Sequence, residues 1–266
     1  MGPLGDTQLT DLTAAAKVAE GGQGTVFRLA RPSGTLLKLY HREVAVLATE
    51  LGRLIDLPAR DVVATRTAWP SGRVFHHGRC VGLLMPEAPD RFATTIAGGR
   101  RLLELQYLLY PRRAMWADLT LPTEAERRGL AAGFVELFRT LHDHDVVVGD
   151  VSMRNLLWTL SGGPGVFAID CDGFRLTGRP PAVRPADTAG WADPACPRDV
   201  TLDTDRYKLA LLTLRLLLGN HRVTPEEVRA KPLLRGRLGP ALTLLATRAA
   251  EPGRRPAAEC WLGALP

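Results

Sequence analysis

The sequence lacks several features that mark particular classes of protein. Its four cysteines are far apart and show no C-x-x-C spacing, so neither a zinc motif nor a disulfide framework is indicated, and we expect reduced thiols. The most apolar run, LALLTLRLLLG at 209–219, is too short to span a bilayer and contains Arg215. No leader of basic and then apolar residues opens the chain, and we expect a soluble, cytoplasmic protein. The cysteines are Cys80, Cys171, Cys196 and Cys260.

Lysine is also scarce, although the chain is basic. Lysine and arginine number 34 against 28 acidic residues, a net charge of +6, and the only lysines are Lys17, Lys38, Lys208 and Lys231. The arginines come in scattered pairs without interleaved aromatic residues, so no nucleic-acid-binding stripe is indicated. Any lysine within a motif is therefore a candidate for a specific role.

The first part of the chain has the pattern of a small sheet with one helix. TVFRLA (25–30) and TLLKLY (35–40) flank a Pro/Gly turn and predict a hairpin. Apolar residues at helical spacing predict a helix within 42–58, closed by proline. VVATRTAWP (62–70) and RCVGLLMP (79–86) are further strand candidates.

The second part has a helical pattern. The segment 122–144 opens with Thr123 and Glu126 at capping-box spacing and continues with one apolar stripe. Residues 205–218 are apolar nearly all round, which predicts a buried helix, and TPEEV (224–228) marks the start of another. We therefore predict an α+β fold, with a β-rich lobe over 1–86 and a larger α-helical lobe over 87–266.

Four short motifs could carry chemistry, and the first is AEGGQGTVFR (19–28). Gly21, Gly22 and Gly24 fall between two expected strands and just before Val26. Glycines there would let backbone amides approach phosphate oxygens without a Cβ in the way. The same residues fit an ordinary hairpin turn.

The second motif is Lys38 on the next strand, followed by a helix with Glu43 and Glu50. A lysine on a strand can hold the α- and β-phosphates of a nucleotide while a helix glutamate positions it. We favour Glu50 as the partner, because Glu43 is too close in sequence to sit in mid-helix. The alternative is a solvated surface lysine.

The third and fourth motifs supply polar groups at the ends of apolar strands. In VVVGDVSMRNLLW (146–158), Asp150 could accept a hydrogen bond from an attacking hydroxyl and Asn155 could bind magnesium, although Asp and Asn are also common in turns. In VFAIDCDGF (166–174), Asp170 and Asp172 suit a hard divalent cation.

Together and in this order, the motifs resemble those of the protein-kinase fold. AEGGQGTV is similar to the glycine-rich loop, LLK to the strand lysine, DVSMRN to the catalytic loop and DCD to the metal-binding triplet. WADP (191–194) stands where the activation segment should end. TDRYKLALL (204–212) resembles the start of the helix that anchors the catalytic loop, with Asp205 as its characteristic acid. RRPAAECWLGAL (254–265) resembles the arginine-proline segment near the end of the kinase domain. The resemblance covers roughly residues 14–266.

The resemblance implies a bilobal serine/threonine kinase that uses ATP and Mg²⁺, with ATP between the two lobes. Asp150 would orient the substrate hydroxyl, and Asn155, Asp170 and, more weakly, Asp172 would bind magnesium. Lys38, held by Glu50, would fix the α/β-phosphates, and the adenine would reach backbone groups of Leu84, Met85 and Pro86. The phosphates would be covered by Gly21, Gly22, Gly24 and Val26.

Four positions depart from the kinase pattern. Ala19 replaces the first loop glycine, and Gly149 replaces the arginine before Asp150, so control by activation-loop phosphorylation is not expected. Ser152 stands in place of the catalytic-loop lysine, and Arg154 is a candidate to supply the missing charge. Ala195 replaces a glutamate, so the ion pair to Arg255 is expected to be absent, with Trp191 as an alternative anchor for the segment.

These departures leave alternatives open. The missing lysine also fits small-molecule phosphotransferases of the aminoglycoside type, and a nucleotide-binding pseudokinase scaffold is a third possibility. The segments LHDHDVVVGDVSMRNLLW and AIDCDGF are similar to a bacterial kinase-like branch that accompanies von Willebrand A-type proteins and metal-dependent protein phosphatases. That resemblance implies a protein substrate and such partners. We expect neither a nucleic-acid nor a membrane partner.

Overall fold

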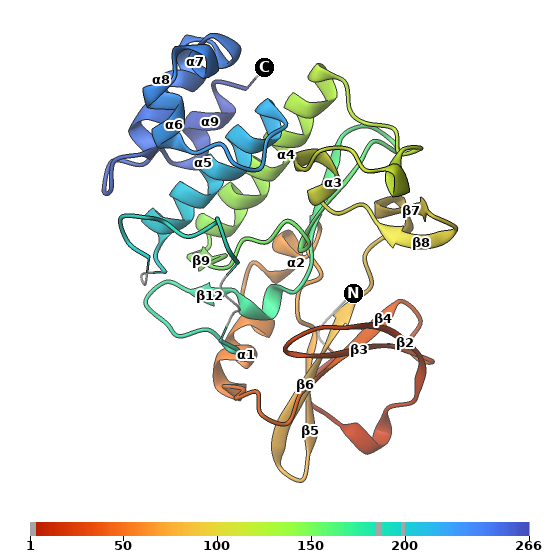
Figure 1. The fold of residues 1–266 in the computed structure, drawn as a ribbon. Coiled ribbons are helices and arrows are strands. Elements are labelled where there is room, and N and C mark those ends of the chain that lie inside the picture. The colour runs from red at the N-terminus through yellow and green to blue at the C-terminus, as the bar shows by residue number, and fades with distance from the viewer. Residues whose placement is uncertain (1–3, 185–187, 198–199, 266) are drawn as a thin grey trace. The chain divides into compact units, whose positions relative to one another are not determined.

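The computed structural model describes residues 4–184, 188–197 and 200–265. The chain forms two compact units, drawn as ribbons in Figure 1. The first, called the sheet unit below, comprises Met1–Ala88 and Ile169–Ala186; the second, the helical unit, comprises Pro89–Ala168 and Asp187–Pro266. The change of unit after Ala88 lies beside the expected boundary at residue 86. The sequence pattern did not indicate that residues 169–186 belong to the first unit.

The sheet unit is built on a mixed six-stranded sheet with the order β1-β5-β6-β4-β3-β2. Strand β1 pairs with β5 in parallel, and the other neighbours are antiparallel. The strands are β1 (Thr7–Gln8), β2 (Ala14–Glu20), β3 (Gly24–Leu29), β4 (Thr35–Tyr40), β5 (Gly72–His76) and β6 (Arg79–Pro86). An apolar cluster of Leu29, Leu37, Val74 and Leu84 covers one face of this sheet.

The predicted hairpin is confirmed as β3 and β4, and β6 matches the predicted strand 79–86. The segment 62–70 was wrongly predicted as a strand, because Arg60–Val63 forms helix α2 and the next residues turn. The Thr67 hydroxyl donates to the Val63 carbonyl (2.9 Å), and the Trp69 indole N–H donates to the Leu54 carbonyl (2.7 Å). These side-chain bonds hold the segment against helices rather than in the sheet.

The predicted helix within 42–58 is confirmed only in its second half, as α1 (Ala48–Ile55). Before it the chain is extended: Val46 forms a β-bridge with Val183, and the Leu47 amide donates to the Ala182 carbonyl (2.8 Å). Ala182 and Val183 therefore attach their segment to the sheet unit just before α1. The same segment also carries a 3₁₀ turn at Cys171–Gly173 and strand β12 (Arg175–Leu176).

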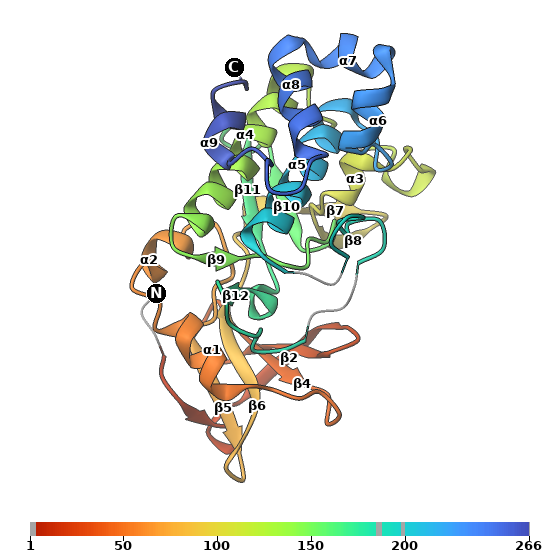
Figure 2. The same ribbon diagram turned by 90° about the vertical axis from the view of Figure 1, so that its left-hand side faces the viewer.

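The helical unit is centred on two long helices, α4 (Glu124–His142) and α5 (Leu202–Leu218), which pack against each other (Figures 1 and 2). Both begin with a capping box, at Thr123 and Thr201. Thr224 caps α6, with proline at its first position, as the sequence predicts. The other helices are α3 (Gln106–Leu109), α6 (Pro225–Ala230), α7 (Pro232–Leu238), α8 (Pro240–Ala249) and α9 (Ala258–Leu262).

Short strands complete the helical unit. Strands β10 (Leu156–Thr159) and β11 (Gly165–Ala168) form one antiparallel pair, and β7 (Ala93–Ile96) and β8 (Gly99–Leu102) another. Strand β9 (Val146–Val147) precedes the Asp150 turn. The predicted burial of α5 is confirmed, since most of its residues are enclosed. Among the described residues, no helix is both long and apolar enough to cross a membrane.

Candidate functional site

The turn between β2 and β3 contains the glycine motif. The Gly21 amide donates to the Gly24 carbonyl (2.9 Å), which closes the hairpin. A Cβ on Gly24 would lie under 3.0 Å from the Leu39 carbonyl oxygen, so the close approach of β3 and β4 requires glycine there. A Cβ on Gly21 or Gly22 would meet no atom within 4 Å, so packing does not require these two glycines. Ala19 lies in extended β2 opposite Val26, a conformation that alanine adopts without strain.

Lys38 lies on β4, opposite Val26 on one side and Leu83 on the other. Lys38 as a whole is only 5% exposed to solvent. The ammonium Nζ lies 3.0 Å from Oδ1 and 2.9 Å from Oδ2 of Asp172. It also lies 3.4 Å from both Asp170 Oδ1 and Gln23 Oε1. Lys38 is thus a buried cation between two carboxylates of the same unit.

Burial by itself lowers the pKa of the Lys38 ammonium, because the charged form loses hydration. The charges and hydrogen bonds of Asp172 and Asp170 outweigh that effect and raise the pKa above its ordinary value. The amine therefore stays protonated at neutral pH. The burial of Lys38 excludes the alternative of a solvated surface lysine, and its protonation leaves a fixed positive charge inside the sheet unit.

Glu50 does not pair with Lys38 in this structure, which corrects the expected partnership. Its Oε1 lies 2.5 Å from Arg179 Nη2 and its Oε2 3.2 Å from Arg179 Nε, and Arg53 is a weaker neighbour at 3.6 Å. The hydrogen bonds from Arg179 lower the pKa of the Glu50 carboxyl, with burial opposing them. Glu43 lies outside α1. Asp172 takes the position at Lys38 that we had expected for a helix glutamate.

Asp170 and Asp172 differ in what surrounds them, although only one residue separates them. Asp172 is 2% exposed, and its Oδ2 also accepts a hydrogen bond from the Tyr40 hydroxyl (2.8 Å). The Asp170 side chain is 39% exposed, and its contact with Lys38 is long. Its backbone has φ 56°, a left-handed conformation that costs energy for a non-glycine residue and often marks functional sites.

The turn that carries Asp150 is fixed from helix α5. Asp205 is fully buried and accepts hydrogen bonds from the amides of Val148 (2.6 Å) and Gly149 (2.9 Å). His142 Nε2 lies 3.2 Å from Asp205 Oδ2. The expected anchoring of this loop by Asp205 is therefore confirmed. Gly149 has φ 74°, a left-handed conformation that favours glycine.

The residues after Asp150 form a compact turn. The Arg154 amide donates to the Ser152 hydroxyl (3.3 Å), and the Asn155 amide donates to the Ser152 carbonyl (3.1 Å). Ser152 thus shapes the backbone between Asp150 and Asn155. Arg154 is exposed and lowers the pKa of Glu104, although burial raises that pKa overall.

The strand residues expected at the adenine are less open than the sequence suggested. The Leu84 carbonyl accepts a hydrogen bond from the Ser71 amide (2.8 Å), so this group is already engaged. Met85 and Pro86 pair with Leu36 and Thr35 of β4, and within the described residues β5 follows β6 only as far as Leu84. Met85 and Pro86 remain candidates for backbone contacts.

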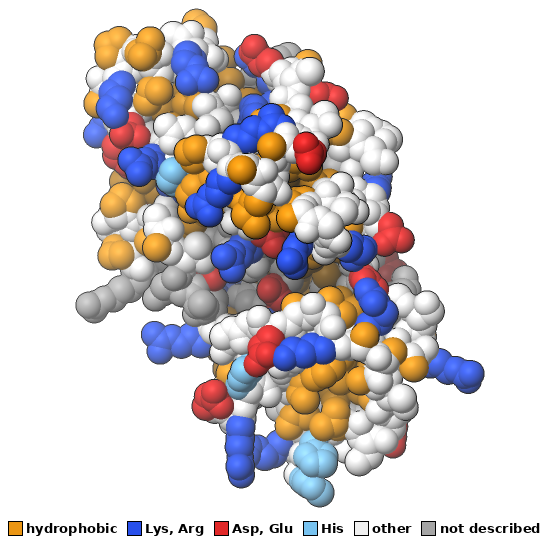
Figure 3. Space-filling model, turned by 45° about the vertical axis from the view of Figure 1, so that its right-hand side comes forward, with side chains coloured by type: hydrophobic (Ala, Val, Ile, Leu, Met, Phe, Trp, Pro, Cys, Tyr) orange, Lys and Arg blue, Asp and Glu red, His pale blue; other side chains and the backbone are white. Residues whose placement is uncertain are grey.

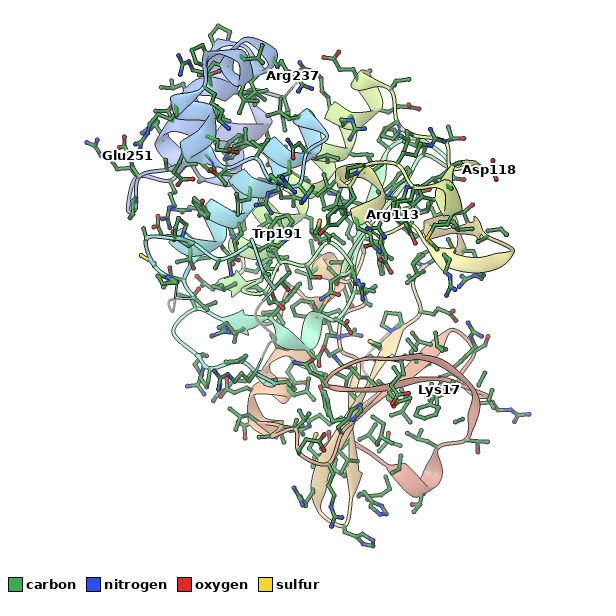
Figure 4. All side chains as sticks on the ribbon, in the orientation of Figure 1. Lys17, Arg113, Asp118, Trp191, Arg237 and Glu251 are labelled. Carbon is green, nitrogen blue, oxygen red and sulfur yellow. The ribbon has the colours of Figure 1, made fainter. Side chains whose placement is uncertain are left out.

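The expected absence of an ion pair at Arg255 is wrong. Arg255 Nη1 lies 2.5 Å from Asp193 Oδ2 and 3.0 Å from Asp203 Oδ2. An aspartate two residues before Ala195 thus supplies the carboxylate. Trp191, labelled in Figure 4, is buried, and the Arg215 guanidinium lies 4.5 Å from its ring centroid.

Sequence reasoning missed Tyr40, Gln23 and Arg179. Tyr40 follows Lys38 by two residues on a strand, so both side chains point to the same face, and this spacing could have identified it. Gln23 belongs to the glycine motif itself. Arg179 gave no signal, because its contact with Glu50 spans 129 residues of sequence.

Two wider observations concern metal ligands and surface charge. No group of three or more His, Cys, Asp or Glu side chains in the described part of the chain could hold a metal ion on its own. On the face drawn in Figure 3, lysine and arginine side chains are scattered rather than gathered in one stripe.

A search with models of known protein families and a search of curated protein sequences both found no match to this chain.

Proposed function

We propose that this protein is a kinase-like phosphotransferase that moves the γ-phosphate of ATP to a serine or threonine hydroxyl of a protein. The observation that carries the proposal is the buried, charged Lys38 amine beside the partly exposed Asp170 carboxylate. One fixed cation and one open anion are what a magnesium–nucleotide complex needs from a protein. The glycine hairpin belongs to the same unit and adjoins Lys38 through Gln23.

The residues of the sheet unit fit a magnesium–nucleotide complex by their chemistry. Asp170 offers a hard oxygen donor, and Gly21 and Gly22 leave room for close backbone approach. When bound, Mg²⁺ would neutralise phosphate charge. Lys38 would hold the α/β-phosphates, and Asp170 would bind the ion. Tyr40 and Asp172 line the other side of the Lys38 amine.

In the helical unit, the Asp150 carboxylate would accept the hydrogen bond of the substrate hydroxyl and orient its oxygen for attack. Asp205 and Ser152 fix the backbone on either side of Asp150. Arg154 would add positive charge near the transferred group. The kinase fold itself is part of this proposal and is supported by the anchored Asp150 turn and by the Arg255–Asp193 pair.

The test is transfer of labelled phosphate from [γ-³²P]ATP with Mg²⁺ to proteins of the native lysate. We expect Asp150→Ala to reduce transfer at least a hundredfold while leaving the nucleotide-dependent thermal shift nearly intact. Asp118→Ala is the control, since that exposed residue lies at the outer edge of the helical unit in Figure 4.

The outcomes separate the three candidate functions. A thermal shift without phosphate transfer to any acceptor would replace the proposal with a nucleotide-binding scaffold. Transfer to aminoglycosides or similar alcohols, but not to protein, would make the protein a small-molecule kinase. Absence of any Mg²⁺–ATP-dependent shift in the wild type would overturn all nucleotide-based proposals.

A further inference from the structure

Lys38 is held from its own strand and from the segment after β11. The Asp172 carboxylate approaches Nζ with both oxygens, at 3.0 and 2.9 Å. The Tyr40 hydroxyl donates to Oδ2 of the same carboxylate at 2.8 Å. All three residues are nearly enclosed, with 5%, 2% and 7% of Lys38, Asp172 and Tyr40 exposed. We call this group the Lys38 clamp.

The clamp leaves little opportunity for Asp172 to bind a metal ion. Its two oxygens already receive three contacts from the ammonium and the phenol, and its surface is closed to solvent. A cation that bound there would displace Lys38 and leave a buried ammonium without a close counter-charge, which is strongly unfavourable. Asp170 has neither restriction, because its side chain is 39% exposed and touches Lys38 only at 3.4 Å.

Tyr40 contributes by fixing the orientation of the carboxylate. Its hydroxyl bond holds Oδ2, so the carboxylate plane cannot rotate away from Nζ without breaking that bond. The Lys38 Nζ also lies 5.7 Å from the centroid of the Tyr40 ring, within reach of a cation–π attraction. Since Lys38 and Tyr40 share one face of β4, the strand itself sets their spacing.

Glu50 is not available for the same role in this arrangement. Its carboxylate is engaged by Arg179 at 2.5 and 3.2 Å, and it makes no contact with Lys38 among the described interactions. Resting on the function proposed above, we infer that Asp172 and Tyr40 are positioning residues that aim the Lys38 amine at the nucleotide phosphates, and that Asp170 is the only one of the two aspartates that binds the magnesium ion.

The first experiment needs no nucleotide and uses the scarcity of lysine. The nucleotide-free protein is acetylated with an N-hydroxysuccinimide ester, and the rate at each lysine is followed by mass spectrometry. Lys17 and Lys231 serve as internal standards, because their side chains are 55% and 58% exposed. We expect Lys38 to react at least ten times more slowly than these two. Asp172→Asn and Tyr40→Phe should increase its relative rate, the first more than the second.

The second experiment measures nucleotide affinity by titration with Mg²⁺–ATP and, where transfer is seen, KM and kcat. Asp172→Asn should weaken affinity and raise KM for ATP at least tenfold, and Tyr40→Phe about threefold. The Glu50→Gln variant should have a smaller effect than Asp172→Asn. Asp56→Asn, an exposed acid in the same unit, and Tyr110→Phe, in the helical unit, are matched controls.

The results can overturn the inference independently of the proposed function. If Lys38 reacts as fast as Lys17 in the wild type, or if neither variant changes its rate, the clamp does not hold Lys38. If Glu50→Gln weakens ATP binding as much as Asp172→Asn does, Glu50 is the working partner and the inference fails. If the wild type binds no ATP while Lys38 labelling responds to both variants, the proposed function and the nucleotide and magnesium roles fall, and only the positioning of Lys38 by Asp172 and Tyr40 stands. Tyr40→Phe keeps the test decisive should Asp172→Asn not fold.

Discussion

The sheet unit and the helical unit both bury charged residues, but they use them differently. In the helical unit, Asp205 accepts from two enclosed backbone amides, and Arg255 forms an enclosed pair with Asp193 beside its contact with the partly exposed Asp203. In the sheet unit, the group of charges around Lys38 includes the Asp170 carboxylate, whose side chain is 39% exposed. The Arg255–Asp193 pair is enclosed on both sides, whereas the Lys38 group includes a carboxylate, Asp170, that is more than one-third exposed.

This difference separates charges that hold the fold from charges that could bind a ligand. A closed cluster satisfies every charge within the protein, so its loss should appear mainly as lost stability. An open cluster leaves charge for an external partner, so its loss should appear mainly as lost binding. The following changes test that distinction, beginning with those of largest expected effect.

The largest effect is expected from breaking the closed pair of Arg255. The Arg255→Met substitution leaves Asp193, which is 2% exposed, buried without its counter-ion. We expect the free energy of unfolding to fall by about 3–5 kcal/mol, as for other buried pairs that lose one partner. Urea denaturation measures this. The neighbouring Arg254→Met is the control, since that side chain is 77% exposed; equal losses in both variants would contradict the closed-cluster reading.

A somewhat smaller loss is expected at Asp205. Asp205→Ala removes the acceptor for the Val148 and Gly149 amides and leaves both donors buried. We expect the free energy of unfolding to fall by about 3 kcal/mol, the order of magnitude for unsatisfied buried groups. Amide hydrogen exchange at Val148 and Gly149 should rise in parallel. A stable variant whose exchange at these two amides is unchanged would show that Asp205 does not anchor the turn.

The glycine hairpin sharpens the comparison within the sheet unit. In Gly24→Ala the new methyl group meets the Leu39 carbonyl, so we expect a loss of about 2 kcal/mol from overpacking. In Gly21→Ala the methyl group meets nothing, and the change in unfolding free energy should be within about 1 kcal/mol. Thermal denaturation of the two variants and the wild type measures both changes in stability. Equal destabilisation would mean that Gly21 is also required by the fold.

The smallest effect is expected at the exposed edge of the sheet unit. Arg179→Ala removes the partner of Glu50, but the Arg179 side chain is 43% exposed, so solvent should limit the loss to at most about 1 kcal/mol. Arg179 lowers the pKa of Glu50, so the pair stabilises the fold above the ordinary glutamate pKa of about 4.3.

The difference in stability between this variant and the wild type should therefore disappear as pH falls through the pKa of Glu50. Unfolding curves at neutral pH and near pH 3 provide the measurement. A difference that persists at low pH would show that Arg179 contributes through packing rather than through its charge.

Local patterns in the sequence predicted several elements well. The hairpin around residues 31–34, the Thr123 capping box and the proline start at 225 all depend on neighbours within a few residues. The positions of Lys38 and Asp205 also followed from strand and helix patterns. In these cases the physical cause of the structure lies within the segment itself.

Long-range pairing explains most of what the sequence could not provide. Glu50 pairs with Arg179 instead of Lys38, Asp193 pairs with Arg255, and residues 169–186 join the sheet unit. Each of these results depends on which distant segments meet. The failed strand at 62–70 has a different cause, since the Thr67 and Trp69 side chains bond to helix carbonyls and override β propensity.

Trp69 also offers an optical consequence. It is the only tryptophan in the sheet unit, since the others are Trp116, Trp158, Trp191 and Trp261. It is fully buried, and its ring meets that of Phe174 edge-on at 6.1 Å between centroids. A chain in which the other four tryptophans are phenylalanine would emit from this position alone. Its fluorescence would show whether the sheet unit melts together with the helical unit or separately from it.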